Sequence, residues 1–86
     1  MERLRKQDAE AGIDEKPLTD SQRAAIAEAR SVYEARVAER RIMHESSVAG
    51  VFDPAERSQR DDELRRDLDR FESDRDSKIK RIRAGS

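Results

Sequence analysis

The chain lacks cysteine and is poor in aromatic residues, glycine and proline. Its 86 residues include no Cys, no Trp, one Tyr, two Phe, three Gly and two Pro. Without cysteine, these residues form no disulfide, no thiolate zinc site and no thiol redox centre. The three scattered glycines leave no phosphate-binding loop. A chain of this length forms at most one domain, and 34% apolar residues are too few for a round hydrophobic core.

Long apolar runs and an excess of one charge are missing as well. The 19 basic and 20 acidic residues leave a net charge of −1, so no overall basic field attracts nucleic acid. No apolar run approaches the roughly 20 residues of a membrane span, and the first residues, MERLRKQDAEAG, lack the apolar stretch of a signal peptide. These absences predict a cytoplasmic protein with no membrane partner, and they disfavour nucleic acid as a partner.

Charge is what the chain has in abundance, at 45% of its residues. Such a composition is compatible with disorder or with long helices that share a narrow apolar seam. Residues 1–17 are polar and are punctuated by Gly12 and Pro17, which predicts a flexible N-terminal arm, with a short helix over 2–10 as the alternative. The periodicity of residues 18–86 predicts helices.

The first predicted helix covers residues 19–49. Thr19 is a favourable N-cap, and Gln22, three residues later, completes a capping-box pattern. Gly50 follows the helix and is expected to adopt the left-handed conformation that ends many helices.

The second predicted helix covers residues 54–84, after a turn over 50–53. Asp53 is expected at the N-cap and Pro54 at the first helical position, where proline loses no hydrogen bond. Glu56 lies in the first turn, where a negative charge suits the helix dipole.

The apolar residues of both segments recur at steps of three and four that repeat every eleven residues, a rhythm close to that of a straight α-helix. The seam of the first helix is expected to contain Ile26, Ala29, Tyr33, Val37, Val48 and Val51, with a polar gap at Arg40 and His44. The seam of the second is expected to contain Leu64, Leu68, Phe71, Ile79 and Ile82, with Arg75 in the gap. Tyr33 and Phe71 should lie at the same height and pack across the seam.

These patterns predict an all-α fold, an antiparallel helical hairpin of two long, coiled-coil-like helices. The burial of so few apolar residues only marginally offsets the entropy lost when two long helices become ordered. We therefore expect a homo-oligomer, with two hairpins joined as a homodimer into a four-helix bundle. Acid-before-base pairs at i, i+4 are expected to add a little stability. They are Asp61–Arg65, Asp62–Arg66, Asp74–Lys78 and Asp76–Lys80.

No catalytic, metal or cofactor site is expected. His44 is the single histidine, and its place on the seam predicts a packing or hydrogen-bonding role. The carboxylates all have cations nearby and no apolar pocket that would shift their pKa values. We therefore predict a protein that is not an enzyme.

The predicted turn is the candidate binding site. Acidic side chains crowd around it, and Phe52 has no place on the seam. A long hairpin with such a tip is suited to enter a cleft of a larger protein. The simpler interpretation is that Asp53-Pro54 is only a good helix start and that Phe52 folds back onto the turn. The residues expected to contact a protein partner are Phe52, Asp53, Glu56, Arg57 and Ser58.

The stretch Asp53-Pro54-Ala55-Glu56-Arg57-Ser58 resembles the tip motif D-x-x-D-x-A of the DksA/TraR family. That family inserts a helical hairpin into the secondary channel of bacterial RNA polymerase. The C-terminal "KIKRIRAGS" resembles the helix end that precedes the family's four-cysteine zinc finger. Glu56 replaces the second Asp, Ser58 replaces the Ala, and the finger is absent. The resemblance implies that Asp53 and Glu56 face the polymerase active centre.

Three functions are compatible with these observations. The first is a non-enzymatic protein-interaction module that regulates transcription by inserting its tip into RNA polymerase. The second is a structural or self-assembling coiled coil. The third is nucleic-acid binding through the basic open end, Lys78 to Arg83, where no interleaved aromatic residue is available to stack on bases.

Overall fold

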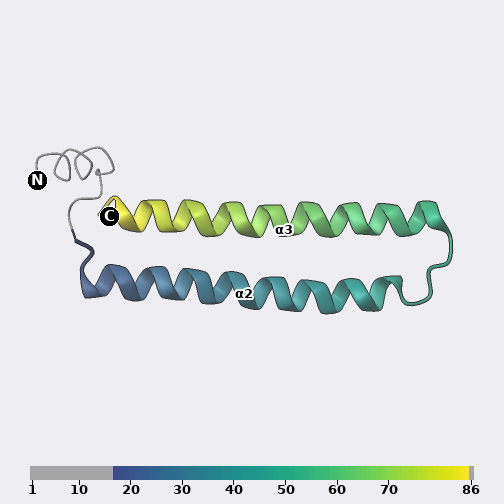
Figure 1. Cartoon of the computed structure of the whole chain (residues 1–86), viewed down its shortest axis with the longest axis horizontal. Coiled ribbons are helices and arrows are strands. Elements are labelled where there is room, and N and C mark those ends of the chain that lie inside the picture. The colour runs from purple at the N-terminus through teal and green to yellow at the C-terminus, as the bar shows by residue number, and fades with distance from the viewer. Residues whose placement is uncertain (1–16, 86) are drawn as a thin grey trace, which may run out of the picture.

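A computed structural model describes residues 17–85 and shows two long helices lying side by side and antiparallel (Figure 1). Helix α2 spans Asp20–Val48 and helix α3 spans Pro54–Arg83. Each is about 45 Å long at 1.5 Å per residue. The predicted all-α hairpin is confirmed, with helix bounds within one residue of those expected. Residues 1–16 of the predicted arm lie outside the described residues.

The N-terminus of α2 has the predicted capping box. The backbone N–H of Gln22 donates to Thr19 Oγ1 over 3.0 Å, and Thr19 N–H donates to Gln22 Oε1 over 2.9 Å. Gln22 Nε2 also donates to the backbone carbonyl of Ile82, 2.9 Å away. The cap of one helix therefore holds the end of the other, and the open end of the hairpin is closed by one side chain.

The end of α2 differs from the prediction. Gly50 does not adopt the left-handed conformation. Among the described residues, only Gly85 has a positive φ, at 91°. The α2 C-cap is Ala49 in the right-handed helical region, with φ −57° and ψ −34°. A backbone hydrogen bond from Val51 to Val48, 3.0 Å long, closes the turn. The φ angle stays negative where the chain leaves α2, so this turn does not need the conformational freedom of glycine.

The start of α3 keeps the expected backbone but not a side-chain cap. Asp53 has extended dihedrals, φ −76° and ψ 121°, and Pro54 opens the helix. The Asp53 side chain makes no capping hydrogen bond. The Asp53 carbonyl accepts from Arg57 N–H over 3.0 Å, so the backbone alone begins the helix.

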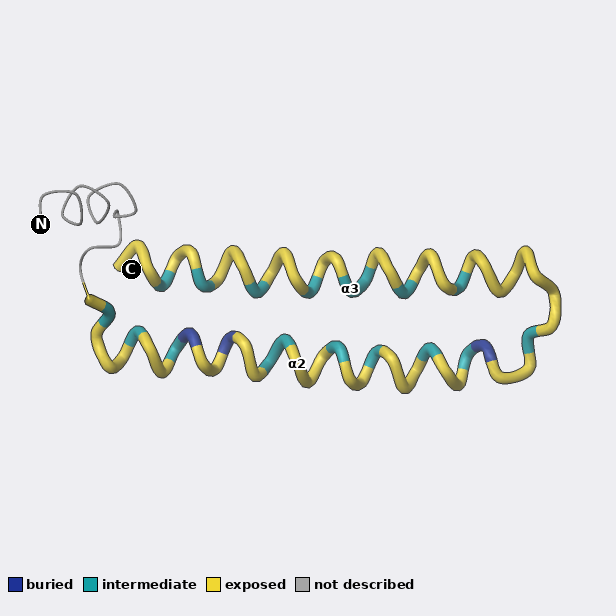
Figure 2. The backbone as a smooth tube through the Cα atoms, viewed as in Figure 1, coloured by how far each residue is buried: buried dark blue, intermediate teal, exposed yellow. Residues whose placement is uncertain are grey.

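The predicted seam is the observed helix interface. Every residue expected on it is buried or half-buried, and both helices turn these positions toward each other (Figure 2). The fully buried part is small, however, and consists of Ile26, Ala29 and Val48. The hydrophobic contribution to stability is therefore limited.

Polar pairs fill the expected gaps of the seam. Arg40 Nε donates to Asp67 Oδ2 over 2.7 Å. His44 Nε2 lies 3.0 Å from Asp61 Oδ1, and its side chain is 14% exposed. His44 therefore lies in the interface, in agreement with the predicted packing or hydrogen-bonding role, and its neighbour there is the carboxylate of Asp61.

The expected i, i+4 ion pairs are not those that the structure contains. Asp61 contacts His44 and Asp74 contacts Arg36, both across the two helices. Asp76 contacts its neighbour Arg75 at 2.9 Å. The remaining member of the expected set pairs at i, i+3, with Arg65 Nη1 3.9 Å from Asp62 Oδ1. The prediction was wrong because these carboxylates have other cations within reach, on the facing helix or one or three residues away on their own helix, and they contact those cations instead.

Candidate functional site

The turn between α2 and α3 lies at the end of the hairpin opposite the residues that begin and end the described chain (Figure 1). Phe52, in this turn, is 91% exposed. The interpretation in which Phe52 folds back onto the turn is therefore wrong. Exposing an aromatic ring to water costs free energy in proportion to its apolar area. The hairpin nevertheless exposes this ring at its end.

The acidic residues of the tip have few local partners. Asp53 is exposed and its carboxylate caps no helix N–H. Glu56 Oε2 lies 3.4 Å from Arg60 Nη2, and both side chains are substantially exposed, at 50% and 38%. Exposed pairs of this kind are weak. Both carboxylates remain accessible to a partner.

The other two predicted tip residues, Arg57 and Ser58, are exposed as well. All five predicted site residues are therefore exposed, in the turn and at the start of α3. We call Phe52, Asp53, Glu56, Arg57 and Ser58 the tip.

The seam behind the tip contains polar side chains. The His44–Asp61 contact lies within it, and the Nδ1 atom of His44 and the Nε atom of Arg60 are buried without a hydrogen-bond partner among the described residues. Unpaired buried polar atoms destabilise a fold.

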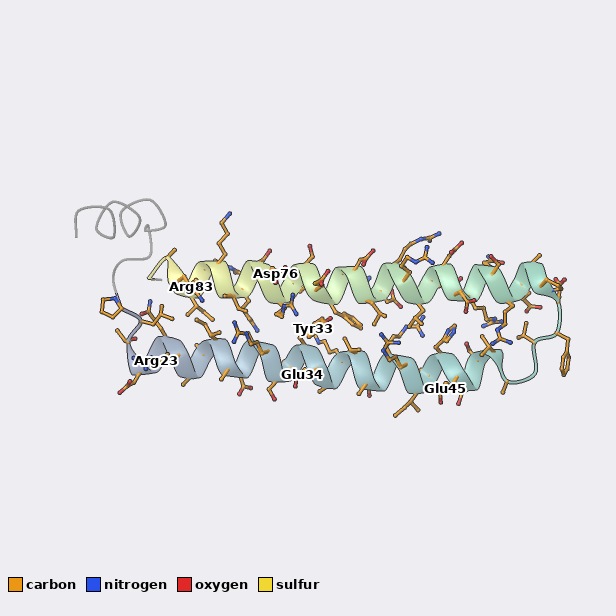
Figure 3. All side chains as sticks on the ribbon, viewed as in Figure 1. Arg23, Tyr33, Glu34, Glu45, Asp76 and Arg83 are labelled. Carbon is orange, nitrogen blue, oxygen red and sulfur yellow. The ribbon has the colours of Figure 1, made fainter. Side chains whose placement is uncertain are left out.

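A concave region that was not predicted from the sequence lies between the helices toward the open end, with a volume of about 250 Å³. Tyr33 points toward α3 there (Figure 3). The Arg75 guanidinium carbon lies 4.4 Å from the centre of the Tyr33 ring, and those of Arg36 and Arg70 lie 5.8 Å from the centre of Phe71. Tyr33 and Phe71 both line this region, with guanidinium groups beside both rings. The sequence contained a signal for this arrangement, because Arg75 interrupts the apolar seam of α3 between Phe71 and Ile79. The predicted packing of the two rings against each other stays a prediction.

This cavity is an unconvincing ligand site. It is open and polar, and its walls are residues of the seam and its rims: Ala29, Val32, Tyr33, Arg36, Phe71, Asp74, Arg75, Ser77, Lys78 and Arg81. Arg36 contacts Asp74 at 3.9 Å, and Arg75 contacts Asp76 at 2.9 Å. These cations are already paired with carboxylates, so they offer a small ligand little unsatisfied charge.

Within residues 17–85, no group of three or more His, Cys, Asp or Glu side chains is arranged to hold a metal ion. Neither described helix is long and apolar enough to cross a membrane.

No protein-family model matches this chain, and neither a curated protein nor a solved structure is detectably similar to it.

Proposed function

We propose that this chain is a non-enzymatic protein-interaction module that presents its tip to a cleft in a larger protein. The observation that carries the proposal is the 91% exposure of Phe52 at the end of the hairpin. Aromatic side chains are frequent anchors of protein interfaces because they bury much apolar area at little entropic cost. The two helices hold this anchor about 45 Å from the open end, far enough to enter a deep cleft.

The charge around Phe52 defines the kind of cleft. The Asp53 carboxylate caps no helix, and Glu56 makes only an exposed contact with Arg60. A partner surface with an apolar pocket beside basic residues or a bound cation would complement the tip. The resemblance of Asp53 to Ser58 to the DksA/TraR tip motif makes the secondary channel of bacterial RNA polymerase the partner that we propose.

The experiment uses the tip itself as the probe. A photo-crosslinking phenylalanine derivative replaces Phe52 in one variant and Ser73, exposed on α3, in a control variant. With purified bacterial RNA polymerase, we expect crosslinks from position 52 to the walls of the secondary channel and none from position 73. A wild-type chain that does not bind polymerase would rule out this partner.

Substitutions then separate the tip from the rest of the surface. We expect Phe52→Ala and Asp53→Asn each to weaken binding at least about tenfold without lowering the melting temperature. Met43→Ala and Asp69→Asn are the controls, since both residues are exposed and lie away from the tip. Equal binding by Phe52→Ala and wild type would show that the tip is not the contact surface.

The carboxylate of Glu56 is tested by function. Glu56→Gln retains a side chain suited to the first helical turn and loses only the exposed contact with Arg60. We expect an unchanged melting temperature and loss of any effect of the protein on initiation from a ribosomal-type promoter. A Glu56→Gln protein as active as wild type would remove the charge of Glu56 from the proposed mechanism.

A further inference from the structure

The side of α2 that faces away from α3 carries no charged residue along a continuous line. The members of this line are exposed and either small or aliphatic: Ala24, Ala27, Ser31, Ala35, Ala38, Ile42, Ser46 and Ala49. At 100° per residue they lie roughly opposite the seam. Ile42 is 65% exposed, which leaves a large aliphatic side chain in water with no partner among the described residues. We call this line the outer face of α2.

The corresponding side of α3 is different. It carries charged residues throughout: Asp62, Arg66, Asp69, Asp76 and Lys80. The uncharged line is therefore a property of α2 and not of an exposed helix in this protein generally. We propose that the outer face of α2 docks, antiparallel, on the outer face of α2 of a second copy of this chain.

The spacing of the outer face fits a two-fold axis. From Ala24 to Ala49 the steps are 3, 4, 4, 3, 4, 4 and 3 residues, which is the same series from either end. An antiparallel second copy therefore matches every position of the face with another position of the face. A two-fold interface requires such self-complementarity.

The pairs that this axis creates are also complementary in size. Ile42 lies opposite Ser31 of the second copy, so each of the two large side chains meets a small one. At the centre, Ala35 lies opposite Ala38 of the second copy. Small residues at the centre allow two helices to approach at the short end of the usual interaxial range, about 8 Å.

The charges beside the outer face favour the same arrangement. Four exposed residues on one flank, each just before a member of the face, are Arg30, Glu34, Arg41 and Glu45. None of them takes part in an ion pair or hydrogen bond within residues 17–85. Glu34 and Glu45 point away from α3 (Figure 3). Along the helix these residues stand in base-before-acid order at i, i+4, the less favourable orientation.

The two-fold axis supplies these charges with partners. It places Arg30 opposite Glu45 of the second copy and Glu34 opposite Arg41 of the second copy. Each pair occurs twice, so four ion pairs flank the interface. In a parallel pair, Glu34 would face the opposite flank, which carries Glu39, and like charges would meet. Flanking charges set helix orientation in this way in coiled coils.

The proposed dimer is independent of the tip. An antiparallel pair of α2 helices points the two turns in opposite directions, so both tips stay accessible. It also covers the exposed Ile42 and packs each α2 between its own α3 and the second α2. A failure of polymerase binding would leave this proposal intact, and a monomeric protein would leave the tip proposal intact.

Orientation is tested with cysteine, because the chain contains none. Ala24→Cys and Ala49→Cys are made as separate full-length proteins. A disulfide requires Cα atoms about 4.4–6.8 Å apart. Under mild oxidation we expect the mixture of the two proteins to form a crosslinked heterodimer, while each protein alone remains largely uncrosslinked. Efficient crosslinking of Ala24→Cys with itself would overturn the antiparallel arrangement.

The surface is tested by sedimentation equilibrium. Ala35→Glu places a carboxylate at the centre of the face, where no cation faces it, and we expect dimerisation at least about a hundredfold weaker. Ser73→Glu, on the outside of α3, is the matched control and should leave the dimerisation constant unchanged. Circular dichroism should show the same helicity for both variants. A wild-type chain that is monomeric up to about 1 mM, or equal dimerisation of Ala35→Glu and wild type, would overturn the proposal.

Register is tested by exchanging charges. Glu34→Arg should weaken the dimer about tenfold, because it sets an arginine against Arg41 of the second copy in two places. Adding Arg41→Glu to the same chain should restore wild-type affinity, because the exchanged pair is again of opposite sign. A double variant as weak as the single one would show that these two residues do not face each other.

Discussion

The Nε–H of Arg40 on α2 donates a 2.7 Å hydrogen bond to Oδ2 of Asp67 on α3, across the seam. The two side chains are 19% and 30% exposed, so this pair is more sheltered than the Arg36–Asp74 pair between the same helices, whose side chains are 51% and 61% exposed. Arg70 Nη2 lies 3.5 Å from the other carboxylate oxygen of Asp67. Asp67 therefore joins a cation of the facing helix to one on its own helix.

This contact predicts a pH dependence. The hydrogen bond from Arg40 lowers the pKa of the Asp67 carboxyl below its ordinary value of 3.8, against the opposing effect of partial burial. A carboxyl whose pKa is lowered in the folded state stabilises the fold at pH values above its ordinary pKa. That stabilisation is lost as the pH falls through the folded-state pKa. We expect the unfolding free energy of wild type to fall below pH 3.8 more steeply than that of Asp67→Asn. Parallel urea-derived profiles would show that Asp67 is not linked to folding.

The aromatic pair of the seam predicts a moderate loss of stability on truncation. Phe71 is half-buried and shares a cavity wall with Tyr33. We expect Phe71→Ala to cost about 2 kcal/mol, below the roughly 3–5 kcal/mol of a fully packed Phe. Thermal and urea melts followed by circular dichroism measure this. A melting temperature within about 2 °C of wild type would contradict the observed seam, since 1 kcal/mol shifts a small domain by roughly 4–8 °C.

The two helix starts predict unequal effects of the same substitution. Thr19→Ala removes a side chain that accepts a 3.0 Å hydrogen bond from Gln22 N–H, and we expect it to cost about 1 kcal/mol. Asp53→Ala removes a side chain without a capping bond, and we expect at most a few tenths of a kcal/mol, from the helix dipole. Chemical denaturation of the two variants compares them directly. Equal losses would mean that the Asp53 carboxylate caps α3 in solution.

The two described turn glycines also predict opposite outcomes. Gly50 lacks positive φ, and a Cβ atom there would meet no atom within 4 Å. Gly50→Ala should stabilise the protein by about 0.4–1 kcal/mol, because it restricts the unfolded chain. Gly85 has φ of 91°, a conformation that alanine adopts only under strain, so Gly85→Ala should destabilise the protein. Destabilisation by Gly50→Ala would indicate a left-handed turn residue at that position.

Much of the candidate site followed from local sequence. The capping residues Thr19 and Gln22 and the proline at position 54 marked the helix ends. The turn therefore fell between residues 48 and 54 with little freedom. The tip residues could be identified because Phe52 has no position in the eleven-residue rhythm of the seam. Its display to solvent could not, since an aromatic ring beside a turn can fold back or stand free, and only the structure shows that the ring stands free, at 91% exposure.

The sequence by itself determined the helices and the face that each one buries. The 3.6-residue period places Ile26 and Tyr33 on one side of α2, and Leu68 and Phe71 on one side of α3, whatever lies opposite. Tertiary structure decided the partners of the charged residues. Asp61 and Asp74 had suitable cations at i+4 on their own helix, yet they contact His44 and Arg36 on the other. Exposed ion pairs differ by only a few tenths of a kcal/mol. The choice among them therefore depends on which cation the packing of α2 against α3 brings within reach, and a one-dimensional pattern does not contain that distance.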